Sequence, residues 1–88
     1  MAFTRTINVS GVSEIDGIDV SINFNYDATT PPTFVSFSFA TPEDANVTGN
    51  CNDTHITDYY VNDGIVSDEL LELVQDECIR VLDNYDKV

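Results

Sequence analysis

The side chains most able to do chemistry in this sequence are carboxylates at helical spacing near the C-terminus. Residues 63–77 read DGIVSDELLELVQDE, with six acids and no Lys or Arg. Glu69, Glu72 and Asp76 recur at intervals of three and four residues, so one face of a helix would carry all three. Between Arg5 and Arg80 the chain has fourteen carboxylates and no basic side chain. This pattern indicates a negative surface rather than a single reactive pair.

A second group of possible ligands is Cys51 and His55, which lie four residues apart in the chain. Structural zinc sites use four ligands from recognisable Cys and His pairs. The one remaining cysteine, Cys78, falls in a segment with helical periodicity, and no further His is present. The pattern is that of a loop histidine beside a loop cysteine, and we predict no metal site and no cofactor.

Residues 58–64, DYYVNDG, resemble the start of a calcium-binding EF-hand loop, but the register does not fit. If Gly64 is the glycine at the sixth loop position, Tyr59 takes the first ligand position. If Asp58 is the first ligand, Asp63 replaces the required glycine. Neither register gives a specific calcium site.

Catalytic motifs are also missing from the sequence. No Ser or Cys nucleophile motif surrounds His55, and no Gly-rich phosphate loop occurs. A pair of carboxylates can act as acid and base only in a cleft that separates their pKa values. A chain of 88 residues with no evident pocket keeps its carboxylates in solvent, and we predict that the protein is not an enzyme.

Composition places the charge on a folded domain. Apolar residues make up 42% of the chain and aromatic residues 10%, which is typical of a globular protein rather than a disordered acidic tail. We expect a single domain over residues 1–88. The net charge of −13 opposes direct binding to nucleic acid or to an anionic membrane. With no signal peptide and no long apolar run, the expected location is the cytoplasm, that of the host cell if the protein is viral.

Alternation of apolar and polar residues predicts strands over residues 3–9, 18–26 and 33–40. Residues 10–17, SGVSEIDG, are expected to form a loose hairpin turn between the first two strands. Residues 41–44 suggest a turn, and 54–61 a fourth strand. The predicted outer face of the sheet is polar and nearly uncharged, with Asp19 and Asp27 as its only acids and Phe34 as its one exposed aromatic candidate.

One clear helix follows. Ser67 is a good N-cap, and Asp68 and Glu69 in the first turn complement the helix dipole. The apolar residues of this segment repeat every three or four positions and predict a stripe that packs on the sheet, formed by Leu70, Leu71, Val74, Cys78, Val81, Leu82 and Tyr85. Asp76 with Arg80 and Asp83 with Lys87 are spaced as local ion pairs. The predicted fold class is therefore α+β, an antiparallel sheet of three to four strands with one C-terminal amphipathic helix packed on one face.

The acids must cluster if they are to imitate a nucleic acid. A chain of this mass exposes roughly 5,100 Å², so an even spread gives about one net charge per 400 Å², far sparser than duplex DNA, with one charge per roughly 1.7 Å of axis. The helix stripe supplies a carboxylate about every 5 Å. We predict that Glu69, Glu72 and Asp76 contact Lys or Arg on a partner, supported by further acids beside the stripe: Asp58, Asp63, Asp68, Glu43 and Asp44.

In general type the chain resembles the small, strongly acidic proteins that phages make against host defence enzymes, including anti-CRISPR and anti-restriction proteins. The resemblance covers no shared motif, so it assigns no functional residues. It implies a non-enzymatic inhibitor that blocks the basic nucleic-acid-binding groove of a Lys/Arg-rich defence nuclease or CRISPR complex. The alternative is a small virion, assembly or oligomeric accessory module that uses the neutral sheet face or a strand edge, and an open edge would also allow a homodimer.

Overall fold

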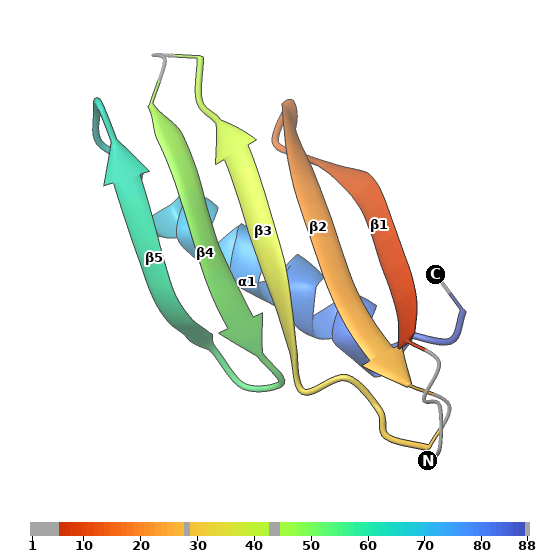
Figure 1. Ribbon diagram of the computed structural model, residues 1–88. Helices are drawn as coiled ribbons and strands as arrows, with labels where there is room; N and C mark the ends of the chain where they lie inside the picture. The colour runs from red at the N-terminus through yellow and green to blue at the C-terminus, as the bar shows by residue number, and fades with distance from the viewer. Residues whose placement is uncertain (1–5, 28, 43–44, 88) are drawn as a thin grey trace.

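The computed structural model describes residues 6–27, 29–42 and 45–87. It confirms the α+β class: one helix crosses one face of an antiparallel sheet diagonally (Figure 1). The sheet has five strands in chain order, where three to four were predicted. The strands are β1 (Thr6–Ile15), β2 (Ile18–Asp27), β3 (Phe34–Ala40), β4 (Asn46–Asn52) and β5 (Ile56–Asn62), and the helix is α1 (Asp68–Asp83). No helix within the described ranges is long and apolar enough to cross a membrane.

The core lies between α1 and the sheet face that it covers. Alternate residues of the central strands point toward the helix, and the buried ones include Val20, Ile22 and Phe24 of β2 and Val35, Phe37 and Phe39 of β3. On α1 the buried residues are Leu70, Leu71, Val74, Cys78, Val81 and Leu82. These residues confirm the apolar stripe predicted from the sequence. Tyr85 extends it, with its ring edge-on to Tyr26 at a centroid distance of 5.0 Å.

Both ends of α1 are capped by side chains. The Ser67 hydroxyl accepts a hydrogen bond from the Leu70 N–H at 3.2 Å, which confirms the predicted N-cap. At the other end the Asn84 amide donates to the Arg80 carbonyl at 2.8 Å. The caps satisfy backbone groups that have no partner inside the helix. The caps therefore stabilise the two ends of the helix against fraying.

The first hairpin is longer and tighter than predicted. The turn is Asp16-Gly17, whose φ angles of 51° and 79° fit a two-residue type I′ turn. The loose turn predicted over residues 10–17 was wrong, because β1 continues to Ile15 and pairs with β2 along its whole length. The prediction failed because Gly11 and Ser13 take inward positions while Val12 is exposed, which reverses the usual alternation.

β4 was missed by the sequence-based prediction because its residues, NVTGNCN, have low strand propensity. Its inward positions are Val47, Gly49 and Cys51. Gly49 lies opposite Phe37 and Tyr59 in the neighbouring strands, and a Cβ added to it would come within 2.8 Å of the Phe37 ring. The glycine therefore leaves room for an aromatic core residue.

The protein has two cysteines, Cys51 in β4 and Cys78 in α1, and both lie where the helix packs on the sheet. Both are free and fully buried. Burial raises the pKa of the Cys51 thiol. The pKa of the Cys78 thiol is raised to about 12, mainly by burial and to a smaller extent by the nearby Cys51. At pH 8 a thiol with that pKa is ionised in only about one molecule in ten thousand, against about one in ten for the ordinary pKa of 9.0. Because the thiolate is the reactive form, Cys78 is poorly nucleophilic in the folded protein.

We therefore expect neither thiol to react with an aromatic disulfide reagent at pH 8 while the protein is folded. Both should react within minutes once the chain is unfolded in guanidinium. The measurement is the absorbance of the released thiol, with and without denaturant. Rapid labelling of the folded protein at one thiol per chain would show that the α1–β4 interface opens.

Candidate acidic interaction face

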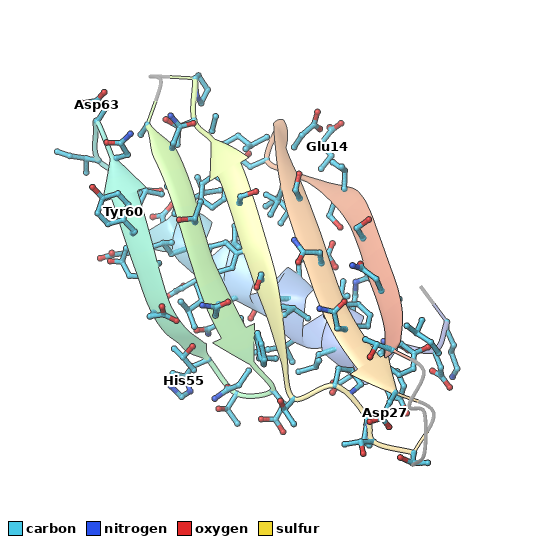
Figure 2. The ribbon with its side chains drawn as sticks, viewed as in Figure 1. Glu14, Asp27, His55, Tyr60 and Asp63 are labelled. Atoms are coloured by element: carbon cyan, nitrogen blue, oxygen red, sulfur yellow. The ribbon has the colours of Figure 1, made fainter. Side chains whose placement is uncertain are left out.

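All carboxylates in the part of the chain that the structure describes lie at the surface, and none is buried. Many belong to one end of the sheet. Figure 2 shows Glu14 and Asp63 at the end that carries the β1–β2 turn, while His55 and Asp27 lie at the opposite end. The meander brings the β1–β2 turn and the β5–α1 connection to the same end. Acids that are far apart in the sequence therefore lie beside α1, where Glu14 and Asp16 line one depression with Asp76 and Glu77.

The three acids of the predicted helix stripe lie on the exposed side of α1. Glu69, Glu72 and Asp76 are all exposed, and the buried residues of the helix occupy its other side. Leu73 lies among them and is 46% exposed. A large apolar side chain surrounded by carboxylates resembles the centre and rim of a protein-binding surface.

On one flank of α1, the helix borders the β1–β2 hairpin. Residues 14–16 of the hairpin and Leu73, Asp76, Glu77 and Arg80 of the helix line one shallow depression. It brings Asp16 to the same surface as Asp76 and Glu77. Glu14 also lines the depression, although it pairs with Asp19 in the row that points away from the helix. The hairpin acids were not among the residues predicted to bind a partner.

Arg80 is the only cation in this depression, and it offsets only one of the acids around it. Its guanidinium forms an ion pair with Glu77, the only ion pair among the residues described. The sequence predicted pairing with Asp76 instead, and this was wrong. The one-turn spacing from Glu77 to Arg80 satisfies the guanidinium within the helix and leaves the Asp76 carboxylate available.

On the other flank, α1 borders β5. Asp68 and Glu72 of the helix line a second shallow depression with Tyr59 of β5. Tyr59 is 51% exposed. The Gln75 side chain accepts a hydrogen bond from the Ile56 N–H at 2.9 Å, which ties this strand to the helix. An exposed tyrosine held beside two carboxylates offers both an aromatic contact and charge to a cationic partner.

These residues lie on the exposed side of α1 and on its two flanks, and we call them together the acidic face. It carries six carboxylates and two exposed apolar or aromatic side chains: Asp16, Asp68, Glu69, Glu72, Asp76 and Glu77, with Tyr59 and Leu73. The sequence identified four of the helical acids, Asp68, Glu69, Glu72 and Asp76, but not Glu77. It missed Asp16, although the Asp-Gly pair at 16–17 is a strong signal for a two-residue turn that would have fixed the position of the hairpin.

The other predicted partner-binding acids have different placements. Asp58 pairs with Asn50 in the row that points away from α1, and it accepts a hydrogen bond from the Asn50 amide at 3.2 Å. It therefore lies on the opposite side of the sheet from the acidic face. Asp63 is exposed in the β5–α1 connection with φ of 59°, a left-handed conformation that Asp tolerates better than most residues. Glu43 and Asp44 lie outside the described residues.

The sheet face that α1 leaves bare is mainly polar, as the sequence predicted, but it carries more acids and aromatic side chains than expected. Glu14 and Asp58 join Asp19 and Asp27 there, and Tyr60 joins Phe34. Its rows are built mainly from Ser, Thr and Asn, among them Ser10, Asn23, Ser36, Thr48 and Asn50. Asp27 lies at its border and has a structural role: its Oδ1 accepts hydrogen bonds from the Thr29 hydroxyl and from the N–H groups of Thr29 and Thr30. These bonds, led by the Thr29 hydroxyl, lower the pKa of Asp27.

The candidate zinc ligands do not converge. Cys51 points into the core, whereas His55 is exposed in the β4–β5 turn, beside the Thr54 hydroxyl at 2.9 Å. Over the ranges that the structure covers, no group of three His, Cys, Asp or Glu side chains is placed to hold a metal ion. What the described acids form is a surface rather than a coordination site.

No known protein family, no curated protein and no solved structure matches this chain. Its function has to be inferred from the chemistry of its own surface.

Proposed function

We propose that the protein is a non-enzymatic inhibitor that binds a basic, nucleic-acid-binding partner through the acidic face. The observation that carries this proposal is the gathering of six carboxylates over α1 and its flanks, with one cation that is already paired. A basic groove shaped for a phosphate backbone would attract this face at long range and would be blocked once it is bound.

The distribution of charge supports this reading over simple solubility. Soluble surfaces usually intersperse both signs of charge. Here Arg80 is the one cation beside the acids of α1, and the Ser, Thr and Asn rows of the bare sheet face carry acids more sparsely, at Glu14, Asp19, Asp27 and Asp58. A higher density of acids over α1 gives the molecule an electrostatic orientation as it approaches a partner.

The class of partner follows from the general resemblance to phage anti-defence proteins. We propose a Lys/Arg-rich defence nuclease or CRISPR complex in the cytoplasm of a bacterial host. The inhibition would be stoichiometric, because blocking a groove consumes one inhibitor for each partner.

A second candidate function is favoured by the mainly polar sheet face and by the uncharged edge of β1. An assembly or accessory module would use these surfaces and would need the acids only for solubility. Salt distinguishes the two functions, because binding between opposite charges weakens as salt rises, whereas pairing of strand edges does not.

The test is a pull-down with the purified protein from the lysate of a bacterial host that carries its defence systems. We expect a Lys/Arg-rich nucleic-acid-binding protein to be retained at about 50 mM salt and released at several hundred millimolar. Retention of the protein's own second copy alone, at both salt concentrations, would contradict the proposal and favour the assembly module.

A further inference from the structure

The two edges of the sheet are protected to very different degrees. Exposed edges invite pairing with other chains, and proteins usually block them with charges, bulges or covering groups. The β5 edge has these devices: Asp58 in mid-strand, a register shift opposite it in β4, and the Gln75 side chain on the Ile56 N–H. The β1 edge has ten residues, and its first eight, TINVSGVS, carry no charge.

The hairpin register indicates which peptide groups of β1 face outward. A two-residue turn makes its flanking pair, Ile15 and Ile18, a hydrogen-bonded pair, and the pattern then alternates along the strands. The inward-pointing residues, such as Gly11 and Ser13, therefore use their N–H and C=O groups on β2. The N–H and C=O groups of Asn8, Ser10 and Val12 point away from β2, so they are available to hydrogen-bond an added strand.

A cleft runs beside this edge, between β1 and α1. Its volume is about 160 Å³, and its walls include Val9, Gly11, Phe24 and Val81, together with Arg80, which is paired with Glu77. A Cβ added to Gly11 would meet nothing within 4 Å. The volume is similar to that of cavities that hold one benzene-sized apolar group. A strand added to β1 would direct alternate side chains toward α1, so one apolar side chain could enter the cleft.

Charges near the edge select what can bind. At the turn end stand Glu14 and Asp16, with Asp76 across the depression on α1. At the other end Thr6 pairs with Asp27 of β2, whose carboxylate is hydrogen-bonded to Thr29 and Thr30, so the acids that face a partner gather at the turn end. An uncharged strand that ends among acids is complementary to an extended segment with an alternating, uncharged middle and Lys or Arg where it meets Glu14 and Asp16. It opposes a second copy of this chain, which brings the same net charge of −13.

We propose that the open edge of β1 takes up an extended cationic segment of the partner by strand addition, with one apolar side chain of that segment in the β1–α1 cleft. The inference rests on the proposed function in one respect, because the segment belongs to the same basic partner. It adds a main-chain contact that the acidic face cannot supply. The acidic face gives long-range attraction, and strand addition gives a fixed register.

The test uses the full chain and a synthetic peptide of alternating Thr and Val with a Lys pair at each end. A peptide with Glu pairs in place of the Lys pairs is the control. We expect the Lys peptide to slow amide exchange at Asn8, Ser10 and Val12 by about tenfold or more, and to bind at least about tenfold more tightly than the Glu peptide. Amides of β5 should not change.

Two substitutions test the edge and the cleft separately. Ser10→Pro removes an outward N–H without touching the β1–β2 ladder, which edge strands tolerate. Gly11→Leu fills the cleft and keeps the N–H groups, so it tests the proposal even if the proline variant fails to fold. Both should lose binding of the Lys peptide, whereas Gly11→Ala should retain it.

The outcomes also separate this inference from the proposed function. Reversal of Glu69 and Glu72 to Lys should weaken capture of the basic partner but leave peptide-induced protection of β1. Protection of β5 instead of β1, no protection at millimolar peptide, or a dimer with β1 protected in the absence of peptide would overturn strand addition by a cationic segment. If the partner is captured and its binding is unaffected by Gly11→Leu, strand addition fails while the proposed function stands.

Discussion

Simultaneous replacement of Glu69, Glu72 and Asp76 by lysine is expected to abolish binding to the basic partner. All three side chains are exposed on the acidic face. The triple variant places positive charges where the partner's own positive charges would lie, and like charges in contact cost several kcal/mol. We expect the affinity to fall at least a hundredfold, or by about 3 kcal/mol. The measurement is the dissociation constant by calorimetry at low salt.

The fold should survive this change. Lysine has nearly the same helix propensity as glutamate and a better one than aspartate. The main cost is loss of the favourable Glu69 interaction with the helix dipole, about 0.3–1 kcal/mol. Circular dichroism and thermal unfolding check this directly. If the variant lost its helix, its loss of binding would reflect unfolding and not the reversed charges.

A matched control separates the position of the charges from their number. Lysine at Asp19, Asp53 and Asp86 also reverses three exposed acids, and each replacement adds two charges, so both triple variants change the net charge from −13 to −7. The control should retain most of the affinity because these residues lie away from the acidic face. Equal losses in the two variants would show that total charge, not the face, determines binding.

The second large effect concerns stability. Gly49→Ala is expected to destabilise the protein by about 2 kcal/mol, because overpacking a filled core costs roughly 1–3 kcal/mol. The added Cβ would lie 2.5 Å from the backbone oxygen of Asp58 and 2.8 Å from the Phe37 ring. The backbone contact cannot be relieved by a rotamer change, so β5 or the ring has to move. For a domain of this size the melting temperature should fall by roughly 8–16 °C.

Gly11→Ala is the control, because it makes the same substitution on the same face of the sheet. Its Cβ would meet nothing within 4 Å, and alanine restricts the unfolded chain more than glycine does. We expect its melting temperature to stay the same or to rise slightly. A Gly49→Ala melting temperature equal to that of Gly11→Ala would contradict the close packing of β3, β4 and β5 around Phe37.

The helix and the central strands could be predicted from the sequence because their patterns are complete. In β2 the apolar residues Val20, Ile22 and Phe24 alternate without interruption, and every buried residue of α1 was in the predicted stripe. The second half of β1 and the whole of β4 break the pattern at Gly11 and Gly49. At Gly11 the inward position is left open as part of the β1–α1 cleft. At Gly49 the corresponding space is occupied by the Phe37 ring of β3. Neither arrangement is visible in the local sequence.

The acidic face was predictable only where a single element determines it. The spacing of Glu69, Glu72 and Asp76 placed them together on α1. Asp16 lies beside the helical acids because the β1–β2 hairpin borders α1. Asp58 does not, because its position in the pairing of β4 with β5 directs its side chain away from α1. A shift of one residue in a strand moves a side chain to the other face. Without the register of β4 and β5, sequence alone could not assign Asp58 to a side.

The most direct test of the central claim is a competition between this protein and duplex DNA for the captured partner, repeated over a series of salt concentrations. We expect the protein to displace DNA until one molecule is bound for each groove, and the logarithm of its association constant to fall linearly with the logarithm of salt concentration. A partner that holds DNA and this protein at the same time, with an affinity for the protein that does not change with salt, would contradict the account.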